Sequence, residues 1–530
     1  MKKLMSLILA VIMLFAVAVP GVQALAAPNY VTIYIQGYGE SLYDAEGNYI
    51  WNGGPVESMM TGLKDVLDDL LIDLGIASIT GNYDEYCDRL YNAMAPAFKD
   101  LILDKDGNAR DGSGIDSNML KDPYSVRYNR IKTGEIEFEY DWRLSCEENA
   151  AILEQFVDRV CREKKYTKVN LLGRCLGGNI VAAYLQNGKN LDKIGKVILY
   201  VSSTDGVDFI SSLFSGKLKL NDDNIKNFVK YTLPATAKFE DQGTYEIINT
   251  LIEFVNEAYV LGFGADVIQD IFDAVKSNVL ARLVRDSYGG FVSYWNMVCD
   301  EDVEDAISLI YNTPELQSEY AVMIEKIRSF HENVQVNARN RMLELKAQGI
   351  DFMVISKYNY ANIPLSEDGD KQSDGTALTS ATSFGATVAK FGKTLSDSYV
   401  SGIGEADRRY LSKDNMIDAS TCVFPEKTWF IKNCFHDVFP SSVDKLFDAF
   451  LTTDNMTVFT DETYSQYLDY NEEADTLTPV VGIAEEDIVD ESKGQKASVF
   501  IRFFTLVLNF FRKLFTGELD LGSLFGSKEA

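Results

Sequence analysis

One short stretch of the chain carries a reactive side chain between closely spaced glycines. Gly173-Arg-Cys-Leu-Gly177 follows the mainly apolar residues 169–172 and precedes a second apolar run at 180–185. The first run predicts a strand and the second a helix, so Cys175 lies at the corner between them. Glycines two positions before and after such a corner relieve its crowding. A cysteine there is typical of a nucleophile that attacks a carbonyl carbon.

A thiol at this corner needs a base to accept its proton, and the sequence holds two histidines. His331 lies in the middle of a helical pattern, where a structural histidine is the more common interpretation. His436 lies in a loop directly after a strand predicted at residues 427–431. His436 is therefore the candidate base.

The base in turn needs an acid that holds its tautomer and its orientation. The loop after residue 356 offers Asp368, Asp370 and Asp374, of which Asp374 is followed by Gly-Thr. All three lie between Cys175 and His436 along the chain. The sequence favours Asp374 as the acid and leaves Asp368 and Asp370 open.

The elements that must position these residues follow a strand and helix alternation. A helix over residues 145–162, capped by Ser145 and Glu148, leads directly into the strand before Cys175. This alternation predicts βαβ units and a parallel sheet. The expected strands cover residues 31–35, 134–141, 169–172, 196–203, 351–356 and, as the last one, 427–431.

The alternation stops between residues 206 and 349, where helical patterns follow one another without a strong strand signal. An all-helical block between two strand signals indicates a cap over the end of the sheet. Helices are expected there at 223–229, 244–259, 265–284 and 314–346, and before it at 56–74 and 84–103. Residues 103–111 carry many side-chain oxygens but lack the downstream Glu of a calcium loop, so a plain turn is favoured over a calcium site.

Composition limits the compartment and the partners. Residues 1–26 read as a signal peptide, with Lys2 and Lys3, an apolar core and a small-x-small cleavage site, which predicts an exported protein. A formal charge of −29 argues against nucleic acid as a partner. An odd count of seven cysteines leaves at least one thiol unpaired, and Cys175 is the candidate. The other six are compatible with three disulfides or with none.

The end of the chain changes in character. Residues 481–497 form an acidic linker, and a largely apolar helical pattern with one narrow polar stripe follows. Contact with a membrane surface through residues 498–516 and packing against protein are equally compatible with this pattern.

In their chain order, the motifs resemble the α/β hydrolases of the lecithin:cholesterol acyltransferase and lipase group. The resemblance covers residues 30 to 450. It rests on Gly37-Tyr-Gly39, Tyr140-Asp-Trp-Arg143, Gly173-Arg-Cys-Leu-Gly177, Asp374-Gly-Thr376 and His436, with an early hairpin at 44–51 and a cap stretch at 285–295.

The resemblance implies an α/β-hydrolase fold with a large helical cap insertion and a triad of Cys175, Asp374 and His436. The backbone N–H groups of Tyr38 and Leu176 would receive the oxyanion. Cysteine replaces the usual serine, as in the similar Gly-x-Cys-x-Gly-Gly corner of dienelactone hydrolases and polyhydroxyalkanoate synthases. No metal or cofactor is implied.

The expected organisation and function follow from these observations. We expect a signal peptide at 1–26, hydrolase core at 27–205, helical cap at 206–349, further core at 350–480, an acidic linker at 481–497 and an amphipathic helix and tail at 498–530. The function implied is an exported acyl-ester hydrolase or acyltransferase that acts on a small or lipid-like ester. The alternatives are an inactive hydrolase fold that serves as a surface or membrane binding module, and a scaffold that acts mainly through its tail helix.

Overall fold

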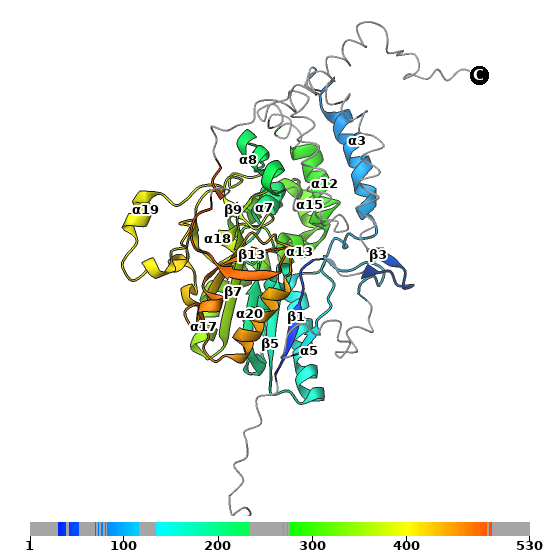
Figure 1. Cartoon of the computed structure of the whole chain (residues 1–530). Helices are drawn as coiled ribbons and strands as arrows, with labels where there is room; N and C mark the ends of the chain where they lie inside the picture. Colours follow the sequence, from blue (N-terminus) through cyan, green and yellow to red (C-terminus); the bar gives the residue numbers. More distant parts are fainter. Residues whose placement is uncertain are drawn as a thin grey trace, which may run out of the picture.

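The structure is a computed structural model of the 530-residue chain (Figure 1). It describes residues 30–38, 42–51, 82–115, 134–232, 276–484 and 487–489, with single residues at 69, 73, 76, 77, 80, 269 and 273. The predicted signal peptide, the helices predicted at 56–74 and 244–259 and the amphipathic helix at 498–516 lie outside the described residues. Among those that are described, no helix has the length and apolar character needed to cross a bilayer.

The described part of the chain is built on a sheet of eight strands in the order β14-β13-β12-β7-β6-β5-β1-β4. All neighbouring strands are parallel except β13 and β14. The strands are β1 (Tyr30–Ile35), β4 (Glu135–Glu137), β5 (Lys168–Arg174), β6 (Ile194–Tyr200), β7 (Asp351–Tyr358), β12 (Thr428–Lys432), β13 (Tyr467–Asn471) and β14 (Thr476–Pro479). This confirms the predicted α/β class with a mostly parallel sheet.

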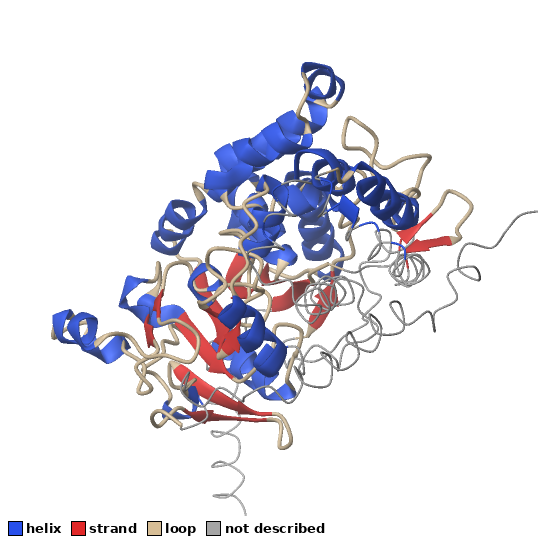
Figure 2. Cartoon of the chain, turned by 90° about the horizontal axis from the view of Figure 1, so that it is seen from above, coloured by secondary structure: helices blue, strands red, loops and turns tan. Residues whose placement is uncertain are grey.

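Helices cover both faces of this sheet. Successive strand residues point to opposite faces, and apolar side chains on each face pack against helices. On one face Leu171 packs in a cluster with α5 (Cys146–Lys164) and α6 (Leu176–Asn187). On the other face Leu172 packs with α20 (Ser441–Thr452). Figure 2 shows helices on either side of the strands.

Short elements complete the described fold. The other helices are α3 (Asp84–Met94), α7 (Asp208–Ser215), α8 (Asp222–Asn227), α12 (Ala281–Arg285), α13 (Val292–Trp295), α14 (Val303–Ile310), α15 (Pro314–Glu319), α16 (Ala321–Ser329), α17 (Ala338–Ala347), α18 (Thr379–Thr382) and α19 (Asp397–Gly402). Three two-stranded sheets pair β2 (Leu42–Tyr43) with β3 (Tyr49–Trp51), β8 (Tyr360–Ala361) with β9 (Gln372–Ser373), and β10 (Thr387–Val388) with β11 (Ile417–Asp418).

The described residues of the block at 206–349 form helices joined by turns and loops and include no strand, and Figure 1 shows α7, α8, α12, α13 and α15 gathered above the sheet. The side chains of this block pack directly against those of the sheet. Phe214 and Trp295 of this block belong to the same buried cluster as Val169 of β5 and Leu199 of β6. The block therefore shares its core with the strands that carry the candidate nucleophile.

Several predicted boundaries are wrong. The strand predicted at 427–431 is not the last, since β13 and β14 follow it at the sheet edge. The single helix predicted at 314–346 is divided into α15, α16, a π-helical turn at Phe330–Gln335 and α17. The helix predicted at 84–103 ends at Met94, because Pro96 lacks the N–H that an α-helix requires and the chain continues as a 3-10 turn.

Candidate active site

Cys175 lies at the single-residue corner between β5 and α6. Its backbone has φ 49° and ψ −121°, a conformation that residues other than glycine rarely adopt. Such strain persists only where the surrounding structure imposes it, and it clusters at functional sites. The corner therefore presents a half-buried thiol at the carboxyl end of a central strand.

Three glycines allow this corner to form. A Cβ on Gly177 would lie 2.1 Å from the carbonyl oxygen of Ile35 in β1, and a Cβ on Gly173 would lie 2.9 Å from the carbonyl oxygen of Gly177. At Gly178 it would lie 2.1 Å from the hydroxyl of Ser202. Side chains at these positions would push α6 away from the sheet. The predicted strand, turn and helix are confirmed together with the physical reason for their glycines.

His436 and Asp374 form a buried pair beside the thiol. The distance between His436 Nδ1 and Asp374 Oδ2 is 2.6 Å, and the backbone N–H of His436 donates to the carbonyl oxygen of Asp374 at 2.9 Å. The second carboxylate oxygen of Asp374 accepts from the N–H groups of Thr376 and Ala377, at 3.0 and 2.7 Å. Asp374 is thus fixed by its own loop and holds the imidazole in one orientation.

Each member of this pair stabilises the charged form of the other. Burial disfavours a charged imidazole, but the carboxylate of Asp374 and a hydrogen bond with the Cys175 thiol outweigh it and raise the pKa of His436 to about 10. Burial likewise opposes ionisation of Asp374, yet the contact with His436 lowers the pKa of its carboxyl group below the ordinary value. The imidazole therefore keeps its proton at neutral pH, next to the sulfur of Cys175.

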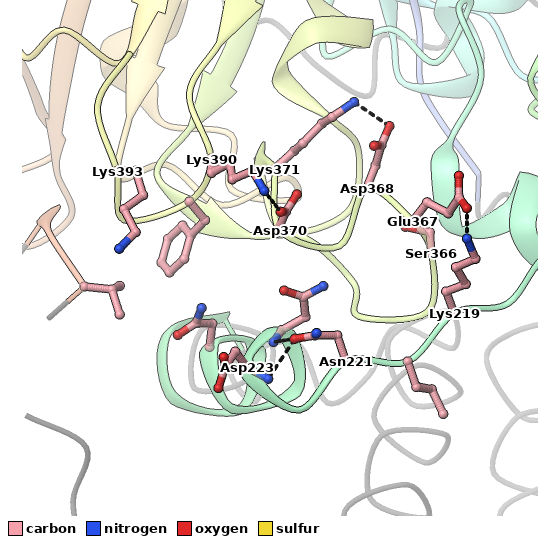
Figure 3. Close-up of a pocket in the computed structure, with 15 residues that line it drawn as sticks. Lys219, Asn221, Asp223, Ser366, Glu367, Asp368, Asp370, Lys371, Lys390 and Lys393 are labelled. Carbon is pink, nitrogen blue, oxygen red and sulfur yellow. Dashed lines mark hydrogen bonds and ion pairs between the residues drawn. The ribbon is translucent and has the colours of Figure 1, made fainter. Parts of the chain in front are cut away.

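The other two candidate acids lie elsewhere. Asp368 pairs with Lys371 at 2.6 Å, and Asp370 pairs with Lys390. Both line a polar surface cavity of about 800 Å³, shown in Figure 3, whose lining includes neither Cys175 nor His436. Of the three aspartates left open by the sequence, the structure brings only Asp374 to the histidine.

His331 is a structural histidine, as its helical pattern predicted. Its Nδ1 lies 2.5 Å from Oε1 of Gln335, and its Nε2 lies 2.8 Å from the carbonyl oxygen of Trp295. Burial lowers its pKa. Both ring nitrogens are therefore occupied within the helical block.

The predicted oxyanion donors both lie next to the nucleophile. Leu176 is the first residue of α6, where backbone N–H groups have no partner within the helix. Tyr38 follows Gly37, whose Cβ, if present, would be 3.8 Å from the sulfur of Cys175. The loop after β1 and the start of α6 thus flank the thiol, as a site for a developing oxyanion requires.

Tyr140 holds the loop after β1 in this place. Its single hydroxyl proton is shared between the carbonyl oxygens of Gln36, at 2.8 Å, and Gly37, at 3.1 Å. Three residues on, Arg143 is fully buried and binds both carboxylate oxygens of Asp141, at 2.9 and 2.7 Å. The Tyr-Asp-Trp-Arg motif therefore supports the loop after β1 through hydrogen bonds to its backbone.

Sequence reasoning missed two cations beneath the triad. Lys357 of β7 is buried and donates to backbone carbonyls of the loop that carries His436. Arg174, directly before the nucleophile, pairs with Asp437 at 2.7 Å. Their positions in the sequence could have indicated them, because Lys357 interrupts one apolar strand pattern and Arg174 ends another.

The remaining cysteines and the oxygen-rich turn have other surroundings than a disulfide or a cluster of metal-binding side chains among the described residues. All seven cysteines are free thiols, so the structure contains none of the three disulfides that the count allowed. In the turn at 103–111, the ammonium of Lys326 donates to the carbonyl oxygen of Gly107 at 3.0 Å and to Oδ1 of Asn108 at 2.9 Å. The described residues include no group of three or more His, Cys, Asp or Glu side chains that would hold a metal.

The arrangement places a thiol, an imidazole and a carboxylate in series, with the loop after β1 and the first turn of α6 beside the thiol. This combination can form and break a covalent bond to an acyl carbon without a further group. No protein-family model matches the sequence, and no curated protein is significantly similar to it, so a functional assignment depends on this geometry.

Proposed function

We propose that this chain is an α/β hydrolase, similar to the lecithin:cholesterol acyltransferase and lipase group, that cleaves or transfers acyl esters through Cys175. The observation that carries the proposal is the buried series in which Cys175 meets His436 and His436 meets Asp374 at 2.6 Å. Two further features support it. The chain order is nucleophile, acid, histidine, and the nucleophile stands on a strained turn at the end of a central parallel strand.

The first half of the reaction is acylation of the thiol. The sulfur of Cys175, as thiolate, attacks the ester carbonyl, and the electron pair of that bond moves to the carbonyl oxygen. The N–H groups of Tyr38 and Leu176 stabilise the resulting oxyanion. As the oxyanion collapses, the bond to the alcohol oxygen breaks and His436 gives its proton to this leaving group. A thioester on Cys175 and a free alcohol result.

The second half removes the acyl group. His436, now neutral, accepts a proton from water or from an acceptor alcohol, whose oxygen attacks the thioester carbonyl. Collapse of this second oxyanion releases a carboxylic acid or a new ester and regenerates the thiolate with the imidazolium. Asp374 stabilises the charged imidazole throughout and does not itself exchange a proton.

The substrate class follows from the same resemblance. An ester of an apolar or lipid-like acyl chain, admitted beneath the helical block at 206–349, is the substrate we propose. Export of the protein and contact of residues 498–516 with a membrane surface are part of the proposal and would bring the site to such esters.

Turnover of p-nitrophenyl esters by matched variants tests the proposal. Cys175→Ala and His436→Ala should each lose activity by a factor of about 10³ or more while remaining folded. Cys161→Ala, which removes a buried thiol from α5, is the control and should retain activity. Undiminished turnover in Cys175→Ala would refute the proposal.

A further inference from the structure

Lys357 is a buried cation that pairs with no carboxylate of the described residues at hydrogen-bonding distance. It lies next to the end of β7, between β6 and β12, and its side chain is fully inaccessible to solvent. Its Nζ donates to the backbone carbonyl oxygens of Phe435 at 2.8 Å, His436 at 2.9 Å and Val438 at 2.7 Å. A buried charge is tolerated only when its hydrogen bonds are satisfied, and here backbone oxygens satisfy them.

Burial lowers the pKa of Lys357, while its hydrogen bonds to backbone carbonyls favour the charged form. A carbonyl oxygen only accepts, and an ammonium offers one N–H to each of the three carbonyls. In that form the nitrogen has no free lone pair, so Lys357 holds backbone and does not serve as a base.

The three carbonyls belong to one segment, and that segment carries His436. β12 ends at Lys432, Asn433 then turns with φ 58°, and α20 begins only at Ser441. No regular element holds the residues between. Lys357 holds the C=O of His436, while the N–H of His436 donates to Asp374 at 2.9 Å. Both backbone groups of the histidine are thus anchored, the C=O by Lys357 of β7 and the N–H by Asp374 in the loop after β9.

We infer that Lys357 is a positioning residue that sets the reach of His436 toward the Cys175 thiol. The effect of Lys357 on ester turnover rests on the proposed function. The effect of Lys357 on the reactivity of the Cys175 thiol does not. A second cation, Arg174, also binds the loop that carries His436, but only through the side chain of Asp437. Lys357 acts on the backbone at three points, so its removal should let the whole loop shift.

Turnover of a p-nitrophenyl ester by Lys357→Met gives the first readout. We expect kcat to fall by about 100-fold, the usual loss when a reacting group is displaced by about 1 Å. KM should stay within about twofold, because the lysine does not touch substrate. Lys357→Arg, which keeps a charged donor, should recover at least about tenfold of the loss. The control is Lys196→Met, because Lys196 donates to the carbonyls of Phe450 and Thr453 at 2.7 and 2.8 Å, on α20 and just beyond it.

The rate of iodoacetamide alkylation of Cys175 against pH gives the second readout and requires no turnover. Wild type and His436→Ala give the two reference profiles, with and without the histidine beside the thiol. In Lys357→Met the profile should move toward that of His436→Ala, with Lys196→Met unchanged. If Lys357→Met does not fold, Lys357→Gln carries the same test.

The two readouts separate the inference from the function. An alkylation profile in Lys357→Met or Lys357→Gln identical to that of wild type would overturn the positioning role. A wild-type protein that alkylates readily but turns over no ester would instead refute the proposed function and leave the role of Lys357 standing.

Discussion

At the scale of single residues, the identity of the proposed nucleophile agrees with the charge state of the histidine proposed as its base. A serine hydroxyl needs a neutral imidazole to take its proton during attack, whereas a thiol can lose its proton beforehand. The raised pKa of His436, about 10, keeps the imidazole charged at neutral pH. An imidazolium beside a thiol favours the thiolate, which is the nucleophilic form of cysteine. Cysteine at position 175 and a strongly basic histidine thus form one functional unit.

Replacement of the acid tests which aspartate serves this unit. Asp374→Asn should lower kcat by about 10³-fold to 10⁴-fold, because an amide cannot hold the imidazole in the same tautomer or stabilise its charge. Asp370→Asn removes an equivalent carboxylate that pairs with Lys390 and should leave kcat within about twofold. The measurement is steady-state hydrolysis of a p-nitrophenyl ester. A larger loss in Asp370→Asn would show that the acid had been misassigned.

The raised pKa of His436 also predicts how stability depends on pH. The folded protein holds the proton more tightly than the unfolded chain, so the contribution is complete below about pH 6.5 and is lost as pH rises toward 10. The unfolding free energy of wild type minus that of His436→Gln, measured in urea, should therefore shrink from pH 7 to pH 10.

His331→Gln is the control for this pH dependence. Burial lowers the pKa of His331, so its linkage has the opposite sign and is complete above about pH 6.5. The difference between wild type and His331→Gln should stay constant from pH 7 to pH 10. A constant difference for His436→Gln over the same range would contradict a raised pKa.

The proximity of Cys175 and His436 could be predicted from the sequence, whereas the residues that hold them in place could not. Cys175 and His436 were found because their chemistry is rare and their neighbours are glycines and strand signals. The choice among three aspartates needed the fold, since all occupy one loop and only Asp374 reaches the histidine. The role of Lys357 depends on carbonyls more than seventy residues away, and backbone groups leave no signature in a sequence.

At the scale of elements, the corner between β5 and α6 is set by how closely α6 approaches β1. The Cβ position of Gly177 lies 2.1 Å from a backbone oxygen of β1, which cannot move without breaking the sheet. The N-terminus of α6 consequently lies at the carboxyl ends of β1 and β5. This close approach brings the N–H of Leu176 and the loop of Tyr38 to the same thiol.

Substitution of this glycine should therefore be severe. Gly177→Ala should lower the unfolding free energy by about 3 kcal/mol, at the upper end for overpacking, because the methyl group meets backbone. Gly402→Ala is the control, since no atom lies within 4 Å of its Cβ position in α19, and its effect should stay within about 0.5 kcal/mol. Urea denaturation measures both. Equal stabilities of the two variants would contradict the close approach.

The predicted elements fail where tertiary contacts decide. β13 (Tyr467–Asn471) and β14 (Thr476–Pro479) are short and largely polar, and they form strands because β12 offers an edge with which to pair. The helical pattern at 314–346 was continuous in sequence, but Tyr320 adopts φ −99° and ψ 19°, which ends one helix and starts the next. Hydrophobic periodicity identifies the face that a helix buries more reliably than the residue at which it ends.

At the scale of the whole molecule, the chain beyond β14 returns to the sheet. The segment from residue 481 was expected to be an acidic linker, yet Asp487 is buried and pairs with Lys432 of β12. Its carboxylate also accepts from Asn359 at 3.0 Å and from the N–H of Ala484 at 2.8 Å. Asp414 lies on the same lysine at 3.3 Å. One buried cation thus ties the end of the described chain to the sheet.

Removal of this anchor should destabilise the molecule. Asp487→Ala should lower the unfolding free energy by about 1–3 kcal/mol, because Lys432 remains buried with fewer acceptors. Asp223→Ala, which removes the exposed partner of Lys226, is the control and should change it by at most about 0.5 kcal/mol. Urea denaturation again measures both. Equal effects would mean that the segment does not dock.

The central claim is that Cys175 carries an acyl group during turnover. Intact-mass analysis of the protein quenched in acid after brief exposure to a p-nitrophenyl ester tests this claim most directly. We expect a mass increase of one acyl group, located on Cys175 by peptide mapping, reversed by hydroxylamine and absent in Cys175→Ala. Turnover without this adduct, or an adduct that persists in Cys175→Ala, would contradict it.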